Sequence, residues 1–188
     1  AGMRARCAAV VLAAVAIPKF LTDAIWWFYL TWLPTFFNSN PAFSTKLDLK
    51  QVGLPFLVIY LFSDLGSVAF GWLASRLIGR GWTVNRARKF TMLICALCVV
   101  PIVIAPLTSS MPLAIALIAL ATAAHQGWSA NLFTAISDQF PQRAVGSVAG
   151  IAGVMGGIGG AIFAAQVGFI INTAGYLPLF IIAATSYL

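Results

Sequence analysis

The chain has 188 residues, of which 61% are hydrophobic and only 8% are charged, and its mean hydropathy is +0.97. Soluble domains carry roughly 25% charged residues, so this composition excludes a water-soluble domain and favours an integral membrane protein. The formal net charge of +7 comes from 11 Lys and Arg against four Asp and no Glu. In a membrane protein such an excess indicates orientation, and not nucleic-acid binding.

The apolar runs predict five full membrane-spanning helices and a sixth that is cut short. Turn-forming residues separate these runs, as at Asn38 to Pro41 and at Asn172 to Gly175. The expected spans cover residues 8–37, 53–75, 89–108, 111–136, 144–171 and 176–188. Because the chain begins without a methionine and ends inside an apolar run, we expect it to be a fragment.

The basic residues predict the orientation of the chain. Successive connections lie on opposite sides of a membrane, which places Lys46 and Lys50 on one side. Eight cations fall on the other side, namely Arg4, Arg6, Arg76, Arg80, Arg86, Arg88, Lys89 and Arg143. The positive-inside rule makes that side cytoplasmic, so the connection 79–88 is expected inside and the connection 39–50 in the periplasm. Asp48 and Asp138 are expected in loops.

Two ionisable residues lie within the first expected span. Lys19 and Asp23 are four residues apart and therefore share a helix face, which Trp26 and Trp27 extend by one turn. An ammonium group, a carboxylate and flat indole rings suit a sugar acid, because they bind its carboxylate, its hydroxyls and its ring. The alternatives are a structural salt bridge within the helix, or a lysine whose side chain reaches the membrane surface.

The fourth expected span carries a polar cluster of His125, Gln126, Ser129 and Asn131. Polar groups in mid-membrane are costly unless they line a cavity, so we assign these residues to recognition of substrate hydroxyls. The alternative for His125 is a helix-packing residue with satisfied hydrogen bonds. One histidine with no nearby cysteine cannot complete a zinc shell, so neither a metal nor a cofactor is expected.

Asp64 lies about halfway along the second expected span and is a candidate for coupling to a proton, with a structural hydrogen bond as the alternative. The fifth span holds half of the 16 glycines. Their small-xxx-small spacings at 146/150, 153/157 and 156/160 predict close helix packing. The aromatic residues Trp32, Phe36 and Phe37 are expected to form an interfacial belt.

The run GWLASRLIGR at 71–80 resembles the cytoplasmic signature of the major facilitator superfamily, with Ser75 in place of the usual aspartate. The resemblance implies a gating role for Gly71, Arg76, Gly79 and Arg80. Physically, the glycines would let two helices meet closely while the arginines bind helix ends, phosphates or carboxylates. The alternative is that the arginines only anchor the topology.

Three further runs are similar to bacterial hexuronate transporters of the anion:cation symporter family. They are KFLTDAIWWFYLTWLP at 19–34, AHQGWSANLFT at 124–134 and SDQFP at 137–141. The resemblance covers essentially the whole chain, which would be helices seven to twelve of a twelve-helix fold with the last one truncated. The resemblance therefore implies an all-α bundle in the membrane. Its expected partner is the N-terminal six-helix half of the same transporter, which is missing here.

What the resemblance implies is proton-coupled uptake of galacturonate or glucuronate across the bacterial inner membrane, by rocking of two six-helix halves. The expected partners are a small organic anion, a proton and the lipid bilayer. One alternative is a carrier of the same fold for another organic anion, such as an aldonate, tartrate or an aromatic acid. The other is an intramembrane enzyme, for which His125 and Ser129 lack a third catalytic group.

Overall fold

A computed structural model describes residues 2–41, 43 and 53–188, and their side chains from residue 12 onward. The described residues form helices and no strand, which confirms the all-α class. The helices are α1 (Gly2–Ser39), α2 (Gly53–Gly79), α3 (Val84–Val99), the 3-10 helix η1 (Val100–Ile104), α4 (Met111–Gln139), α5 (Gln142–Ala174) and α6 (Leu177–Thr185).

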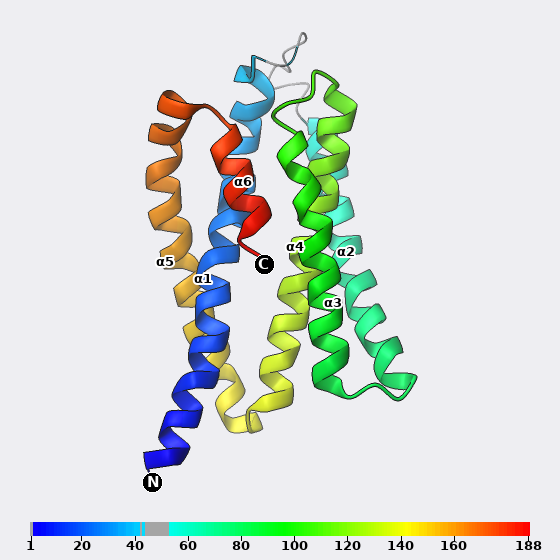
Figure 1. The fold of residues 1–188 in the computed structure, drawn as a ribbon, viewed down its shortest axis with the longest axis vertical. Coiled ribbons are helices and arrows are strands. Elements are labelled where there is room, and N and C mark those ends of the chain that lie inside the picture. The colour runs from blue at the N-terminus through cyan, green and yellow to red at the C-terminus, as the bar shows by residue number, and fades with distance from the viewer. Residues whose placement is uncertain (1, 42, 44–52) are drawn as a thin grey trace.

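The helices run roughly parallel to one long axis (Figure 1). α1 packs along α5, α2 packs along α4, and α3 lies against α4. The N-terminus, the α2–α3 turn and the α4–α5 turn lie at one end of the bundle, and the α3–α4 and α5–α6 turns lie at the other (Figure 1). The described connections therefore alternate between the two ends, as expected for successive spanning helices. Lys46, Lys50 and the side chains of Arg4 and Arg6 lie outside the described residues.

Four of the described helices are long and apolar enough to cross a membrane, judged by length and composition. They are Gly53–Gly79, Val84–Ile104, Met111–Gln139 and Gln142–Ala174. Of the other described α-helices, α1 has 38 residues, among them Lys19 and Asp23, and α6 has nine residues. In the apolar stretch of each of these four helices, 61% of α4 is buried inside the bundle, against 17% for α2 and 22% for α5. α4 is therefore the central helix.

Two helix ends differ from the sequence prediction. The α2–α3 connection is shorter than 79–88, because α3 begins at Val84, so Arg86 and Arg88 lie on the first turns of α3. Likewise α4 continues to Gln139, which places Asp138 in its last turn and not in a loop. α4 stops where Pro141 forces an extended backbone on the residue before it.

The span expected at 89–108 is not one continuous α-helix. α3 changes to the 3-10 helix η1 at Val100, with Pro101 in the first turn of η1. Proline has no N–H and disrupts the α-helical hydrogen bonds before it, which explains the change. At the end of α5 the chain reverses through Gly175, whose φ of 73° favours glycine.

The aromatic residues near the end of α1 lie inside the bundle. Phe36 and Phe37 are fully buried, so the expectation that these two belong to an interfacial belt is wrong, whereas Trp32 is partly exposed. Phe36 packs against Tyr176 and Phe180 with ring centroids 5.1 and 4.9 Å apart. These contacts hold α6 against α1, since aromatic pairs at such distances attract beyond simple burial.

The glycines of α5 fall on two different faces. An added Cβ at Gly156, Gly159 or Gly160 would overlap α1. At Gly153 and Gly157, by contrast, an added Cβ would meet nothing within 4 Å. The 156/160 spacing is therefore confirmed as a packing face, whereas the expectation that 146/150 and 153/157 pack is wrong, since an added Cβ at Gly146 or Gly150 would also meet nothing within 4 Å. Positions 153 and 157 lie on one helix stripe, and that stripe faces open space.

Candidate functional site

The polar residues of α1 and α4 meet in one cavity that α5 completes. This cavity has a volume of about 300 Å³ and is lined by Lys19, Asp23, Trp26, Trp27, His125, Gln126, Ser129, Gly153 and Gly157. Seven of the eight residues predicted to bind substrate line it; the exception is Asn131. The two glycines explain how α5 contributes a wall without filling the space, because they carry no side chain.

Lys19 is the most enclosed charged group of the cavity, with only 5% of the residue exposed. Its Nζ donates to Asp23 Oδ1 at 2.8 Å and to Ser129 Oγ at 3.2 Å, and it lies 4.6 Å from the centre of the Phe133 ring. The burial contradicts the alternative of a lysine that reaches the membrane surface. An ammonium has three N–H donors, so one is left without an oxygen acceptor among the described residues.

An aromatic stack forms the wall beside Lys19. The rings of Trp26 and His125 are 5.0 Å apart and nearly parallel, at 4°. His125 Nδ1 is 2.6 Å from the hydroxyl of Tyr187, and Tyr60 contacts Trp26 edge-on. Trp27 turns toward α5, where it covers Gly160. The two tryptophans therefore reach the cavity from different directions.

Asn131 is placed away from the cavity, in contrast to its assignment to hydroxyl recognition. Its amide donates to the carbonyl of Gly127 at 2.9 Å and to that of Phe70 at 3.4 Å, and its Oδ1 accepts from Arg88 at 3.3 Å. Two residues along a helix rotate a side chain by about 200°, so Asn131 faces the opposite side of α4 from Ser129. Its contacts join α4 to α2 and α3.

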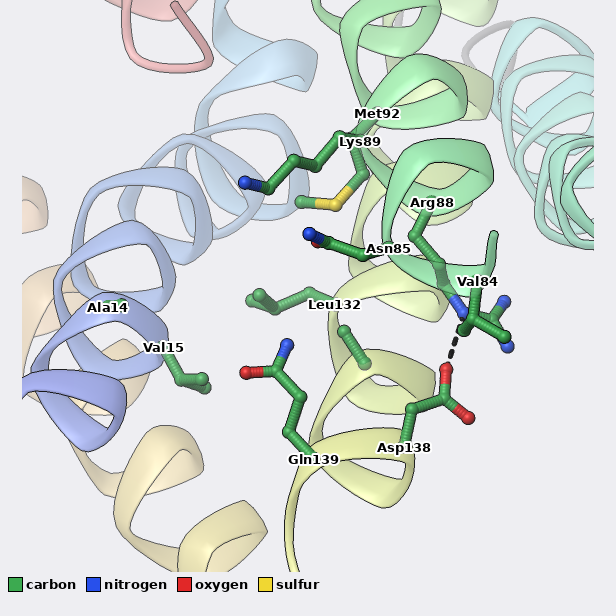
Figure 2. Close-up of a pocket in the computed structure, with 11 residues that line it drawn as sticks. Ala14, Val15, Val84, Asn85, Arg88, Lys89, Met92, Leu132, Asp138 and Gln139 are labelled. Atoms are coloured by element: carbon green, nitrogen blue, oxygen red, sulfur yellow. Dashed lines mark hydrogen bonds and ion pairs between the residues drawn. The ribbon is translucent and has the colours of Figure 1, made fainter. Parts of the chain in front are cut away.

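A second ion pair lies near the ends of α3 and α4. Arg88 Nε is 2.8 Å from Asp138 Oδ2 (Figure 2). The pair borders a cavity of about 620 Å³ whose other walls include Val15, Met92 and Leu132. Sequence reasoning missed this pair because it placed Asp138 in a loop, and because its partner is 50 residues away in the chain.

Asp64 and the 71–80 motif do not join either cluster. Asp64 is exposed on α2, and in the part of the chain that the structure describes it has no hydrogen bond or ion pair. The structural hydrogen bond weighed for Asp64 is therefore absent within that part.

The motif residues point outward. Arg76 lies over the ring of Trp72 at 4.9 Å, and Arg80 is exposed. An added Cβ at Gly71 or Gly79 would meet nothing within 4 Å, so no described helix approaches closely there. The expected close helix contact at these glycines is not formed within the described residues.

Comparison with known proteins places the chain in a family. The family described as Major Facilitator Superfamily matches residues 4–164. The chain is 30% identical over 172 residues to the hexuronate transporter of Escherichia coli (strain K12), covering 90% of this chain and 39% of that protein. It is 24% identical over 167 residues to the D-galactonate transporter of Escherichia coli O6:H1, covering 89% and 38%.

A third relative is the probable galactarate/D-glucarate transporter of Escherichia coli (strain K12), 26% identical over 162 residues that cover 86% of this chain and 35% of the relative. The chain thus spans less than two fifths of the length of these curated relatives. All three relatives are named as transporters. With four apolar helices of spanning length, the chain is a multi-pass integral membrane protein. It belongs to the Major Facilitator Superfamily.

Proposed function

We propose that the chain is the C-terminal six-helix half of a secondary transporter that takes up a hexuronate, such as galacturonate or glucuronate, by alternating access. The observation that carries the proposal is the cavity between α1, α4 and α5, in which a buried ammonium, a carboxylate and two indole rings converge. The similarity to the hexuronate transporter, at 30% identity, supports the same substrate class.

Each chemical group of a hexuronate has a counterpart in this cavity. The Lys19 ammonium has a donor available for the substrate carboxylate, and charge-assisted hydrogen bonds of this kind are strong. Asp23 uses Oδ1 for Lys19, which leaves Oδ2 to accept from a substrate hydroxyl. Gln126 and Ser129 supply further polar groups, and Trp26 and Trp27 offer faces for the sugar ring.

The position of the cavity supports a two-half transporter, because its lining residues Lys19 and His125 lie near the midpoints of α1 and α4. Substrate sites of such carriers lie near the middle of the membrane, where two structural repeats meet. A polar cavity at that depth would be costly if it faced lipid. The partner that the proposal requires is an N-terminal half of six helices, which would close the cavity from the opposite side.

We further propose that the transporter couples uptake to a proton, with Asp64 as the coupling residue. Asp64 lies 11 residues from the start of α2 at Gly53, is exposed, and has no cation partner among the described residues. A lone carboxylate within a spanning helix is a functional candidate by default, because a charged group there is costly without a partner.

The proposal places the protein in a bacterial inner membrane with the α2–α3 turn in the cytoplasm. Arg76, Arg80 and Arg86 gather at that end of the bundle, together with Arg88 and Lys89. The outward position of Arg76 and Arg80 leaves both available for carboxylates of the other half, and this supports a gating role for the motif. A cysteine probe at Thr83 is expected to resist labelling from outside.

Uptake by the complete transporter in proteoliposomes tests the function. Galacturonate and glucuronate are expected to be taken up in proportion to an inward proton gradient, and to compete with each other. A competing candidate is an aldonate or aldarate carrier, favoured by the similarity to galactonate and galactarate/glucarate transporters. If unlabelled galactonate competes strongly and galacturonate does not, the hexuronate assignment is wrong and the second candidate holds.

A further inference from the structure

We infer that Tyr187, just beyond α6, holds His125 in the tautomer that presents an Nε2–H donor to the cavity. The inference rests on the proposed function, because it assigns a recognition role within the same site. Tyr187 is a positioning residue in this scheme, since it acts on the ligand only through His125. The contact that carries the inference is the 2.6 Å hydrogen bond between His125 Nδ1 and the Tyr187 hydroxyl.

The direction of this hydrogen bond follows from which hydrogens need an acceptor. A neutral histidine has one N–H and one bare nitrogen, whereas a tyrosine hydroxyl has one hydrogen to donate. Both side chains are buried, and within the described part of the chain the Tyr187 hydroxyl has no other hydrogen-bond partner. If His125 donated, the phenolic hydrogen would be buried without an acceptor, which folded proteins avoid. Tyr187 therefore donates to Nδ1, and the hydrogen of His125 resides on Nε2.

The Nε2 atom is reachable from the cavity. His125 is one of the residues that line it. Among the described residues, only Tyr29 and Thr91 have a fully buried polar side-chain atom without a partner. Since Nε2 also has no partner and is not among these atoms, it is not fully buried, and the cavity that His125 lines is the space beside it.

The ring of His125 is fixed in this orientation by its neighbours. The Trp26 ring stacks on one face of the His125 ring, with an angle of 4° between the two planes. Tyr187 meets the His125 ring edge-on, with ring centroids 5.9 Å apart and planes at 85°. Tyr187 is itself held edge-on against Trp128 at 5.8 Å. A ring flip would break the stack or the hydrogen bond, so the donor direction is preorganised for binding.

This assignment sharpens which ligands fit. Lys19 and His125 both present hydrogen-bond donors, and Asp23 presents an acceptor. The best ligand then has a carboxylate for Lys19 and a second oxygen acceptor, a hydroxyl or ring oxygen, placed opposite Nε2. An anion with an apolar body would leave the Nε2–H without an acceptor and bind less well.

The test combines ¹⁵N NMR of histidine with galacturonate binding, on the complete transporter in nanodiscs. The signal of His125 is assigned by its loss in His125→Gln. We expect wild-type His125 to show a protonated Nε2 and a bare Nδ1, and Tyr187→Phe to produce a mixture of tautomers. The affinity for galacturonate should fall by about 3- to 10-fold, the range for one hydrogen bond.

Tyr176→Phe is the matched control. Tyr176 is also a buried tyrosine at an end of α6, but its hydroxyl bonds to Ser39 at 2.6 Å, away from the cavity. This variant should change neither the His125 signals nor the affinity.

Three results overturn the inference. They are a wild-type His125 protonated at Nδ1, a Tyr187→Phe variant with the wild-type affinity, and a loss of affinity without any change of tautomer. The wild-type spectrum decides even if Tyr187→Phe fails to fold. Absence of galacturonate binding to the wild type would instead refute the proposed function, while the tautomer result stands on its own.

Discussion

The two ion pairs of the bundle have the same length and different surroundings. Lys19–Asp23 and Arg88–Asp138 both measure 2.8 Å. The first lies within one helix and is largely buried, with side chains 7% and 16% exposed; the second joins two helices near their ends, with side chains 12% and 32% exposed. The first borders a polar and aromatic cavity, whereas the second borders a mostly apolar one.

The difference indicates which pair is built for a ligand. A pair at i, i+4 stabilises its own helix by about 0.2 to 0.5 kcal/mol, which does not offset the several kcal/mol that burying two ions costs. The contact of Lys19 with Ser129 adds one link to α4 and leaves a donor free. Arg88, in contrast, bonds to both Asp138 and Asn131 and so ties α3 to α4. We therefore assign recognition to the first pair and helix assembly to the second.

The largest expected effect is on substrate affinity at Lys19. Lys19→Gln removes the charge but keeps hydrogen-bonding capacity, and should weaken galacturonate binding by about 10- to 100-fold, because charged hydrogen bonds contribute roughly 1.5 to 3 kcal/mol. Arg88→Gln is the matched control and should leave the affinity nearly unchanged, since neither Arg88 nor its partners Asp138 and Asn131 line the substrate cavity. Calorimetry on the purified complete transporter measures both. Equal losses in the two variants would erase the distinction between the pairs.

The second largest effect is expected on stability, at Gly156, which packs against the Asp23 carboxylate. Gly156→Ala places a methyl group against the Asp23 carboxylate, so it should destabilise the protein by about 1 to 3 kcal/mol through overpacking. Gly153→Ala, three residues earlier on the open stripe, should have little effect on stability. Thermal unfolding in detergent compares them. If Gly153→Ala is the more destabilising change, the assignment of the two glycine faces is wrong.

A smaller effect is expected on stability at the second pair. Asp138→Asn should lower stability by about 1 kcal/mol, because the pair is partly exposed to solvent. Arg88→Asp combined with Asp138→Arg should recover part of this loss by forming the pair in reverse. The same exchange at Lys19 and Asp23 moves the ammonium by one helical turn and should not restore galacturonate affinity. Recovery of affinity there would show that only the presence of a pair matters.

The smallest effect on affinity is expected at Asp64, which has no ion-pair partner among the described residues. Asp64→Asn should change galacturonate affinity by less than about twofold, because its side chain does not line the cavity and forms no hydrogen bond to the described residues that line it. Uptake driven by a proton gradient should be lost while galacturonate exchange continues. Gradient-driven uptake at the wild-type rate would remove Asp64 from the coupling mechanism.

Much of this arrangement could be predicted from the sequence, because it depends on local patterns. The apolar runs predicted the helices, and the spacing of Lys19 and Asp23 predicted one shared helix face, on which they form the salt bridge that was weighed as an alternative. Asn131 does not line the cavity, although it is close in sequence to Ser129, because a helix turns about 100° per residue and points the two side chains in opposite directions. Phe36 was misplaced because its burial depends on α6, which no pattern within α1 reveals.

The remaining features depend on contacts between distant segments. Arg88 and Asp138 are 50 residues apart, and Tyr187 is 62 residues from His125. The split of the α5 glycines into a packing face and a cavity face depends on how α5 is rotated about its axis against α1. Periodicity gives the helix faces but not which partner each face meets.

The central claim is that Lys19 recognises the carboxylate of the substrate. The direct measurement is galacturonate binding to the purified complete transporter carrying Lys19→Ala together with Asp23→Ala. Removing both charges avoids an unpaired buried ion, so the double variant should insert and fold normally. The account predicts an affinity about 10- to 100-fold below that of the wild type. A folded double variant with wild-type affinity would contradict it and would leave the pair as a purely structural feature of α1.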